Sequence, residues 1–141
     1  MIGTASAGKH EFLRELSADE AIDYHAEDFA EVAKDIDVVL DTIGGETQMR
    51  SLRTLRPGGI VVSIVPMGSD DFYREAEALG VRAVRMLVDA SRSQLASIAE
   101  LVDAGSVRAR IAASFPLAEI AAAHALGETG RTAGKIVITM V

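Results

Sequence analysis

Two runs that are apolar on both faces constrain the fold of this chain most strongly. Residues 37–42 read DVVLDT, and residues 60–65 read IVVSIV after the turn signal Pro57-Gly58-Gly59. A strand with two apolar faces is typical of a parallel sheet that is covered on both sides. Helical patterns precede and follow both runs, and an alternation of strands and helices predicts an α/β fold.

The alternation continues along the rest of the chain. Ser91 and Gln94 have capping-box spacing, and Gly105 stands where that helix should end. The turn at 57–59 is expected to stop the helix before it. Further strands are predicted at 1–5, 20–24, 81–88 and 134–141, and helices at 10–16, 26–35, 46–55, 70–80, 91–105 and 116–126. The predicted buried stripe of the helix at 91–105 consists of Leu95, Ile98, Leu101 and Val102.

Composition limits the classes of partner. The 141 residues are 49% apolar, which is enough for a packed core in one ordinary domain. The net charge of −7 argues against a nucleic-acid or anionic-membrane surface. The absence of cysteine excludes disulfides and thiolate metal sites. No apolar run has the length of a membrane span, and the first residues do not read as a signal peptide, so we expect a cytoplasmic protein.

An ordered set of motifs resembles the medium-chain dehydrogenase/reductase superfamily, in particular its quinone-oxidoreductase-like, zinc-binding-dehydrogenase branch. The motifs run in the order GTAS, LSADEAIDY, DVVLDTIGGET, LRPGGIVVSI, QLASIAELVDAG, FPLAEIAAAH and GKIVI, over nearly the whole chain. The resemblance implies that residues 1–106 form part of an NAD(P)-binding Rossmann domain. Residues 107–141 are similar to the segment that returns to the family's catalytic domain.

The resemblance also implies what this chain lacks. DVVLDT resembles the fourth Rossmann strand and GGIVVSIV the fifth, so the first strand with its glycine-rich turn should precede residue 1. No G-x-G-x-x-G occurs in the chain. We therefore expect a truncated, doubly wound parallel sheet without its first strand and glycine-rich loop. The family's catalytic domain is also missing, so no catalytic residue is assigned.

The end of the strand at 1–5 bears on the choice of cofactor. By resemblance this strand corresponds to the second strand of a Rossmann domain. An acidic residue at the end of that strand favours NAD, and its replacement beside a cation admits the 2′-phosphate of NADP. Here Ser6 and Lys9 follow the strand, and no acid occurs before Glu11. A hydroxyl and a lysine can bind a phosphate dianion, so the sequence favours NADP.

Other cofactor-binding candidates follow the remaining strands. By resemblance Tyr24 lies near the adenosine phosphate, and the loop of Thr42, Ile43 and Gly44 lines the cofactor cleft, where glycine permits a close backbone approach. Backbone groups after the fifth strand are used by the family for the nicotinamide amide, which points to Val65 and Pro66 among residues 64–68. The role of Lys135, which matches a family lysine, is left open, with a structural role favoured.

The three histidines do not predict a metal site. His10 and His25 lie in polar settings, and His124 lies on the apolar face of the last helix, where a structural role is favoured. Zinc requires three or four convergent ligands, and the sequence offers none. The family's zinc ligands, where present, lie in the missing part.

The favoured function is a fragment of an NADP-dependent oxidoreductase that transfers a hydride between NADPH and a quinone, an enone or another small carbonyl compound. The fragment alone is expected to be inactive. One alternative is an S-adenosylmethionine methyltransferase, whose fourth and fifth strands also resemble DVVLD and LRPGGIVVSI. Another is a non-catalytic interaction module.

Two further expectations concern stability and assembly. Family members usually carry glycine where this chain has Ser17, and a residue ending a helix there would adopt the left-handed conformation. Without the first strand, the strands at 1–5 and 37–42 lack their shared neighbour. They should either pair directly with each other or pair with another copy, and we expect a homodimer.

Overall fold

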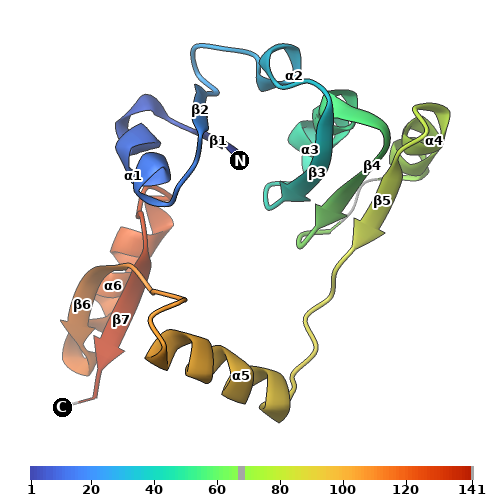
Figure 1. The fold of residues 1–141 in the computed structure, drawn as a ribbon. Helices are drawn as coiled ribbons and strands as arrows, with labels where there is room; N and C mark the ends of the chain where they lie inside the picture. Colours follow the sequence, from blue (N-terminus) through green and yellow to red (C-terminus); the bar gives the residue numbers. More distant parts are fainter. Residues whose placement is uncertain (67–68, 141) are drawn as a thin grey trace. The chain divides into compact units, whose positions relative to one another are not determined.

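The computed structural model describes residues 1–66 and 69–140. The described chain divides into two compact units, Met1–Val88 and Asp89–Val141 (Figure 1). The family-based boundary between 106 and 107 concerns domains of a longer protein, and it stays a prediction. None of the helices in the described residues is long and apolar enough to span a membrane.

The first unit begins with a two-stranded parallel sheet. Strand β1 (Ile2–Ala5) pairs with β2 (Glu20–Asp23), with Ala5 beside Asp23. A 3-10 turn (Ala7–Lys9) and helix α1 (His10–Glu15) connect the two strands. Because parallel neighbours end at the same edge, the residues that follow β1 and β2 are brought together.

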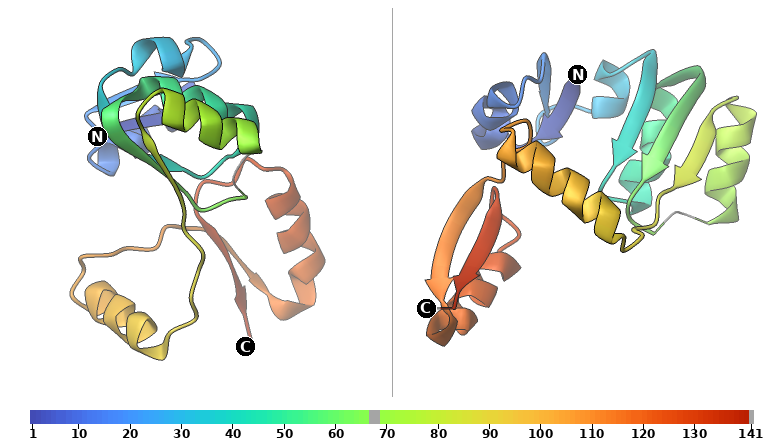
Figure 2. Two further views of the ribbon diagram at one scale, coloured as in Figure 1. Left: turned by 90° about the vertical axis from the view of Figure 1, so that its right-hand side faces the viewer. Right: turned by 60° about the horizontal axis from the view of Figure 1, so that its bottom comes forward.

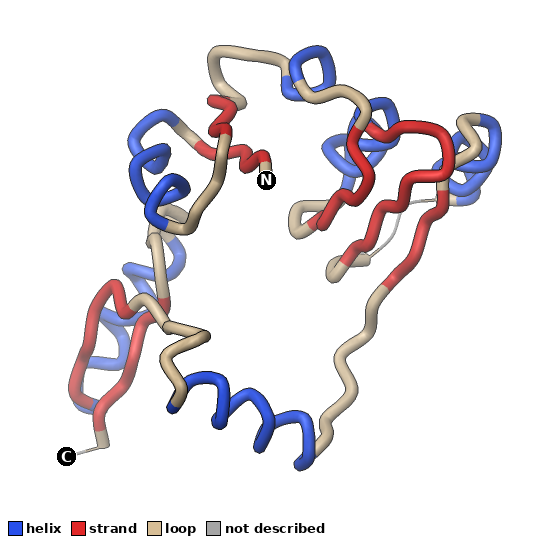
Figure 3. Tube along the Cα trace, in the orientation of Figure 1, coloured by secondary structure: helices blue, strands red, loops and turns tan. Residues whose placement is uncertain are grey.

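A three-stranded parallel sheet follows in the order β3-β4-β5 (Figure 3). Its strands are β3 (Ile36–Asp41), β4 (Leu55–Ser63) and β5 (Arg82–Arg85). The one-turn helix α2 (Phe29–Val32) precedes β3, α3 (Gly45–Ser51) and a 3-10 turn (Leu52–Thr54) connect β3 to β4, and α4 (Asp70–Ala78) leads to β5.

The core of this unit lies on one face of the three-stranded sheet. Its buried side chains are Leu52, Val61, Phe72, Ala76 and Val81. Val39 packs against this core, whereas its neighbours Val38 and Leu40 are 59% and 63% exposed. The predicted apolar character of both faces is correct, but in the described part of the first unit the face that carries Val38 and Leu40 is exposed.

The second unit contains a parallel pair and two helices. Helix α5 (Arg92–Asp103) is followed by β6 (Ile111–Pro116), a 3-10 turn (Leu117–Glu119), α6 (Ile120–Glu128) and β7 (Lys135–Thr139). Helix α6 lies against both strands (Figure 2). Gly134 enters β7 with φ 129, and a Cβ built there would lie 2.7 Å from the Arg110 carbonyl oxygen.

The parallel α/β class is confirmed, with corrections to individual elements. Strand β6 was not predicted. Residues 57–59 do not separate α3 from β4, because β4 starts at Leu55 and includes this turn as a bulged segment. The stripe on α5 is not buried: Leu95, Ile98, Leu101 and Val102 are all exposed in the described chain. The capping of α5 is confirmed, since Ser91 accepts a hydrogen bond from the Gln94 amide.

The strands form three separate sheets rather than one. Among the described residues β1 pairs with β2 and not with β3. Of the two expected outcomes for the missing first strand, direct closure of β1 onto β3 therefore does not occur.

Ser17 adopts the left-handed conformation, as expected from its place after α1. Its φ is 65, and the amide of Ala18 donates to the Leu13 carbonyl to close the helix end. We predict that Ser17→Gly stabilises the chain by up to about 1 kcal/mol, because relief of the left-handed strain exceeds the entropic cost of glycine. Urea unfolding measures this difference. Ser17→Ala is the control and should not stabilise; an equal gain from alanine would contradict the explanation.

Candidate functional site

The carboxyl ends of β1 and β2 bring three predicted residues to one edge. Ser6 directly follows β1, its carbonyl accepts from the Lys9 amide at 2.8 Å, and its hydroxyl makes no capping hydrogen bond. Tyr24 directly follows β2, the parallel neighbour of β1. In the part of the chain that the structure describes, no carboxylate forms an ion pair with Lys9. A hydroxyl and a cation are thus available together at this edge.

A hollow of about 380 Å³ connects Tyr24 with the loop after β3. Tyr24 and Ile43 both line it, and both side chains are largely exposed. Its lining mixes aromatic, β-branched and charged side chains: Thr4, Tyr24, Glu27, Phe29, Ile43, Thr47 and Arg50. The structure therefore brings two of the predicted site residues to one cavity.

Arg50 is the cation of this hollow, and it is already engaged. Its guanidinium forms an ion pair with Asp28 and lies 5.0 Å from the centre of the Phe29 ring. The hydrogen bond from the Ala30 amide lowers the pKa of the Asp28 carboxyl, and the hydrogen bond from Arg50 lowers it further. Arg50 therefore fixes the start of α2 against α3, whereas Lys9 forms no such ion pair with any residue in the described ranges.

The loop after β3 is shaped by the carboxylate of Asp41. Asp41 Oδ1 accepts hydrogen bonds from the amides of Ile43 at 3.0 Å and Gly44 at 2.9 Å. Gly44 has φ 79, and a Cβ built on it would lie 3.2 Å from Val65 Cγ2. Glycine at 44 thus permits both the left-handed turn and the close approach of the loop after β4.

The second oxygen of Asp41 joins this loop to α3 and β4. Asp41 Oδ2 accepts from Gln48 Nε2 at 2.7 Å and from Ser63 Oγ at 2.8 Å, and Gln48 Nε2 lies 3.0 Å from Ser63 Oγ. The three side chains are buried, at 4% exposure or less. We call Asp41, Gln48 and Ser63 the buried polar triad.

The buried polar triad keeps Asp41 ionised. Burial acts to raise the pKa of its carboxyl, but the amides of Gly44 and Ile43 and the two side-chain donors outweigh burial. The pKa is therefore lowered from its ordinary value of 3.8. A buried carboxylate with four donors holds the two loops in one arrangement.

The remaining predicted residues are distributed as follows. Thr42 is exposed, Val65 is half-buried beside Gly44, and Pro66 is exposed. Met67 and Gly68 lie outside the described residues. Lys135 begins β7, in the second unit. The triad was missed from the sequence, although two signals pointed to it: an acid that ends DVVLD and a serine that interrupts IVVSIV.

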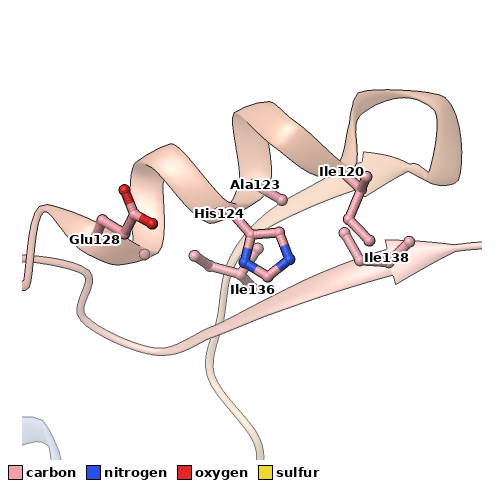
Figure 4. A pocket seen from close by; sticks show the side chains of 7 residues that line it. Ile120, Ala123, His124, Glu128, Ile136 and Ile138 are labelled. Atoms are coloured by element: carbon pink, nitrogen blue, oxygen red, sulfur yellow. The ribbon is translucent and has the colours of Figure 1, made fainter.

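A second hollow, of about 410 Å³, lies in the second unit (Figure 4). Ile120 and Ala123 of α6 and Ile136 and Ile138 of β7 make it apolar, the His124 ring lies between the helix and the strand, and Glu128 also lines it. Over the described ranges, no three His, Cys, Asp or Glu residues gather closely enough to hold a metal ion. The described residues, including those that line this hollow, therefore do not fit a zinc site.

The lowered pKa of Asp41 predicts a specific acid sensitivity. Because the carboxyl has a lower pKa in the folded than in the unfolded chain, its stabilisation is complete above about pH 4 and is lost as the pH falls through the folded value. Urea unfolding from neutral to acidic pH should show a steeper loss of stability for the wild type than for Asp41→Asn. Parallel pH profiles for the two proteins would contradict this role.

The comparisons with known proteins agree with the geometry. Residues 16–138 match the zinc-binding dehydrogenase family. The chain is 35% identical to a 2-haloacrylate reductase of Burkholderia sp over an alignment of 157 positions, which covers 98% of this chain and 47% of that protein. It is 32% identical to a mitochondrial NAD(P)H oxidoreductase of Mus musculus over 93% of this chain and 39% of the other.

A solved structure agrees as well. The quinone oxidoreductase of Coxiella burnetii superposes with a TM-score of 0.89 at 33% identity, over 99% of this chain and 44% of its own. The chain thus spans less than half the length of these relatives. All three are oxidoreductases, which supports the oxidoreductase interpretation over the methyltransferase alternative. The chain belongs to the zinc-binding dehydrogenase family, within the medium-chain dehydrogenase/reductase superfamily.

Proposed function

We propose that this chain is the cofactor-binding part of an NADP-dependent oxidoreductase. The reaction is hydride transfer between NADPH and a quinone, an enone or another small carbonyl compound. The observation that carries the NADP preference is that a hydroxyl, from Ser6, and a cation, from Lys9, both follow the end of β1. Neither side chain is engaged by a described neighbour, and no acid takes the place that would favour NAD.

The other predicted residues fit a dinucleotide along the carboxyl ends of the strands, where ligands of open α/β sheets bind. Tyr24 would lie beside the adenosine phosphate, and the backbone of Thr42, Ile43 and Gly44 would border the cofactor. Backbone groups of Val65 and Pro66 would hold the nicotinamide carboxamide. The nicotinamide supplies the hydride when it is bound, while these residues orient it and exclude water.

The substrate class rests on the names of the relatives. One is named for the reduction of a 2-haloacrylate and one for oxidation–reduction of a quinone, and both compounds are electron-poor. Because the chain spans less than half of these proteins, we place the substrate-contacting residues outside it. The 141-residue chain alone should therefore not oxidise NADPH.

Lys9→Glu tests the cofactor preference. The substitution should weaken NADPH binding by about 1–3 kcal/mol, because a charge-assisted bond is lost and repulsion is added. NADH, which lacks the 2′-phosphate, should lose much less. An NMR titration of the chain detects binding even at millimolar affinity. Arg108→Glu makes the same change of charge at an exposed position outside the site and is the control. Equal losses for both cofactors would refute the assignment.

We also propose that the chain forms a two-fold dimer. Strand β3 is an edge of its sheet, and its exposed face carries Val38 and Leu40. An apolar edge strand is a template for pairing with another chain. Helix α5 adds an exposed apolar stripe. A second copy offers complementary surfaces of the same kind, and closed two-fold assemblies are the commonest.

Light scattering after size exclusion distinguishes the assembly states. The chain should elute at about twice its monomer mass of 14.9 kDa. Leu40→Lys places a charge on the exposed face of β3 and should shift the protein to the monomer. Lys substitution of the exposed Thr42, just beyond the strand, is the matched control. A clean wild-type monomer at high concentration would count against the dimer.

A further inference from the structure

The hydroxyl of Ser63 lies between two hydrogen-bond acceptors. Ser63 Oγ is 2.8 Å from Asp41 Oδ2 and 3.1 Å from the carbonyl oxygen of Val65. Two donors approach the same oxygen, Gln48 Nε2 at 3.0 Å and the Val65 amide at 3.3 Å. A serine hydroxyl has one hydrogen to donate. It can therefore serve the carboxylate or the carbonyl, but not both at once.

The carboxylate is the stronger of the two acceptors. Its distance to Ser63 Oγ is the shorter one, and hydrogen bonds to an ionised acceptor are roughly twice as strong as neutral ones. The two donors from Gln48 and Val65 occupy the lone pairs of the hydroxyl, which is consistent with its hydrogen pointing to Asp41. No backbone amide of the described residues donates to the Val65 carbonyl.

We infer that Asp41 is a positioning residue that holds the hydrogen of the Ser63 hydroxyl away from the Val65 carbonyl. Both lone pairs of this carbonyl are thereby left without competition from the hydroxyl, and one of them can accept from the carboxamide N–H of a nicotinamide ring. The ligand half of this inference rests on the proposed function. The internal half, from Asp41 through Ser63 to Val65, does not depend on any ligand.

Asp41→Asn should reverse the hydroxyl. The amides of Ile43 and Gly44 require an acceptor at one end of residue 41, so the side-chain oxygen of asparagine should stay there. Its NH₂ then faces Ser63, where Asp41 Oδ2 accepted before. The hydroxyl can no longer donate to residue 41, and as long as Gln48 keeps Nε2 toward Ser63 its hydrogen turns to the Val65 carbonyl.

The triad offers a matched rescue. In the double variant Asp41→Asn/Gln48→Glu, a carboxylate returns on α3 at the position of an amide that lies 2.7 Å from Asp41 and 3.0 Å from Ser63. It can accept from the new asparagine and from the serine, so the hydroxyl should again point away from Val65. Ser63→Ala removes the hydroxyl. In this background a substitution at residue 41 cannot change the hydrogen bonding of the Val65 carbonyl through Ser63.

The first experiment follows the carbonyl carbon of Val65 by NMR in the ligand-free 141-residue chain. Asp41→Asn should shift this resonance downfield, because the carbonyl gains a hydrogen bond, and the double variant should return it toward the wild-type position. In the Ser63→Ala background, Asp41→Asn should leave it in place. An unchanged resonance in Asp41→Asn, or an equal shift with and without the Ser63 hydroxyl, would overturn the inference.

The second experiment adds NADPH or adenosine 2′,5′-bisphosphate, which lacks the nicotinamide. Asp41→Asn should weaken NADPH binding by up to about tenfold, the equivalent of one lost hydrogen bond, because the serine hydroxyl then competes for the Val65 carbonyl; the double variant should recover the affinity. Binding of the bisphosphate should change less than about twofold. If the carbonyl resonance responds as expected but NADPH affinity does not, the contact with the carboxamide is wrong while the role of Asp41 stands. Failure of NADPH to shift Val65 in the wild type would refute the proposed function at this loop.

Discussion

One buried carboxylate determines the arrangement of the candidate site. Asp41 ends β3, and its two oxygens accept four hydrogen bonds that reach the following loop, α3 and β4. A buried charge is stable only when its hydrogen-bonding capacity is satisfied, so each donor is constrained by the same group. The positive φ of Gly44 and the contact of that residue with Val65 follow from this constraint. The two loops consequently behave as one element at the carboxyl edge of the sheet.

The site at this edge consists largely of backbone. Gly44, Val65 and Pro66 would contribute amides, carbonyls and space rather than reactive side chains, and this explains why no catalytic side chain emerges from the chain. At the edge of β1 and β2 the opposite would hold, because there we propose that the side chains of Ser6 and Lys9 bind the cofactor. In our proposal, cofactor class therefore depends on side chains after β1, whereas the geometry after β3 and β4 depends on the buried polar triad.

The alternation of strands and helices could be predicted because a short apolar run such as DVVLD is compatible with few structures other than a buried strand. The site residues after β1 and β2 could be placed at one edge for the same reason, since parallel strands align their ends. Strand β6 was missed because IAASFP is rich in small residues and lacks the β-branched pattern of the other strands. The start of β4 was missed because proline and two glycines read as a turn, although here they belong to a bulged strand.

The remaining features could not be predicted from the sequence because they depend on tertiary contacts. The pattern on α5 identified its apolar face, but periodicity does not reveal whether a neighbour within the chain covers that face. The triad could not be predicted because Asp41, Gln48 and Ser63 come from three elements. A polar residue at a strand end usually indicates a loop, and only the folded arrangement turns these three into a buried network.

The three separate parallel sheets have a consequence for how the chain is made. Ile2 pairs with Glu20, Val38 with Ile60, Ile60 with Arg82 and Ile111 with Lys135, so each of the four strand pairings closes over a short stretch of polypeptide. The entropy lost on closing such loops is modest, and contacts of low sequence separation form early. During synthesis from the amino terminus, β1 and β2 can therefore meet before β4 has left the ribosome, and β6 with β7 can form last, without rearrangement of what precedes them. A nascent chain of this design acquires its sheets one at a time, in the order in which they are translated.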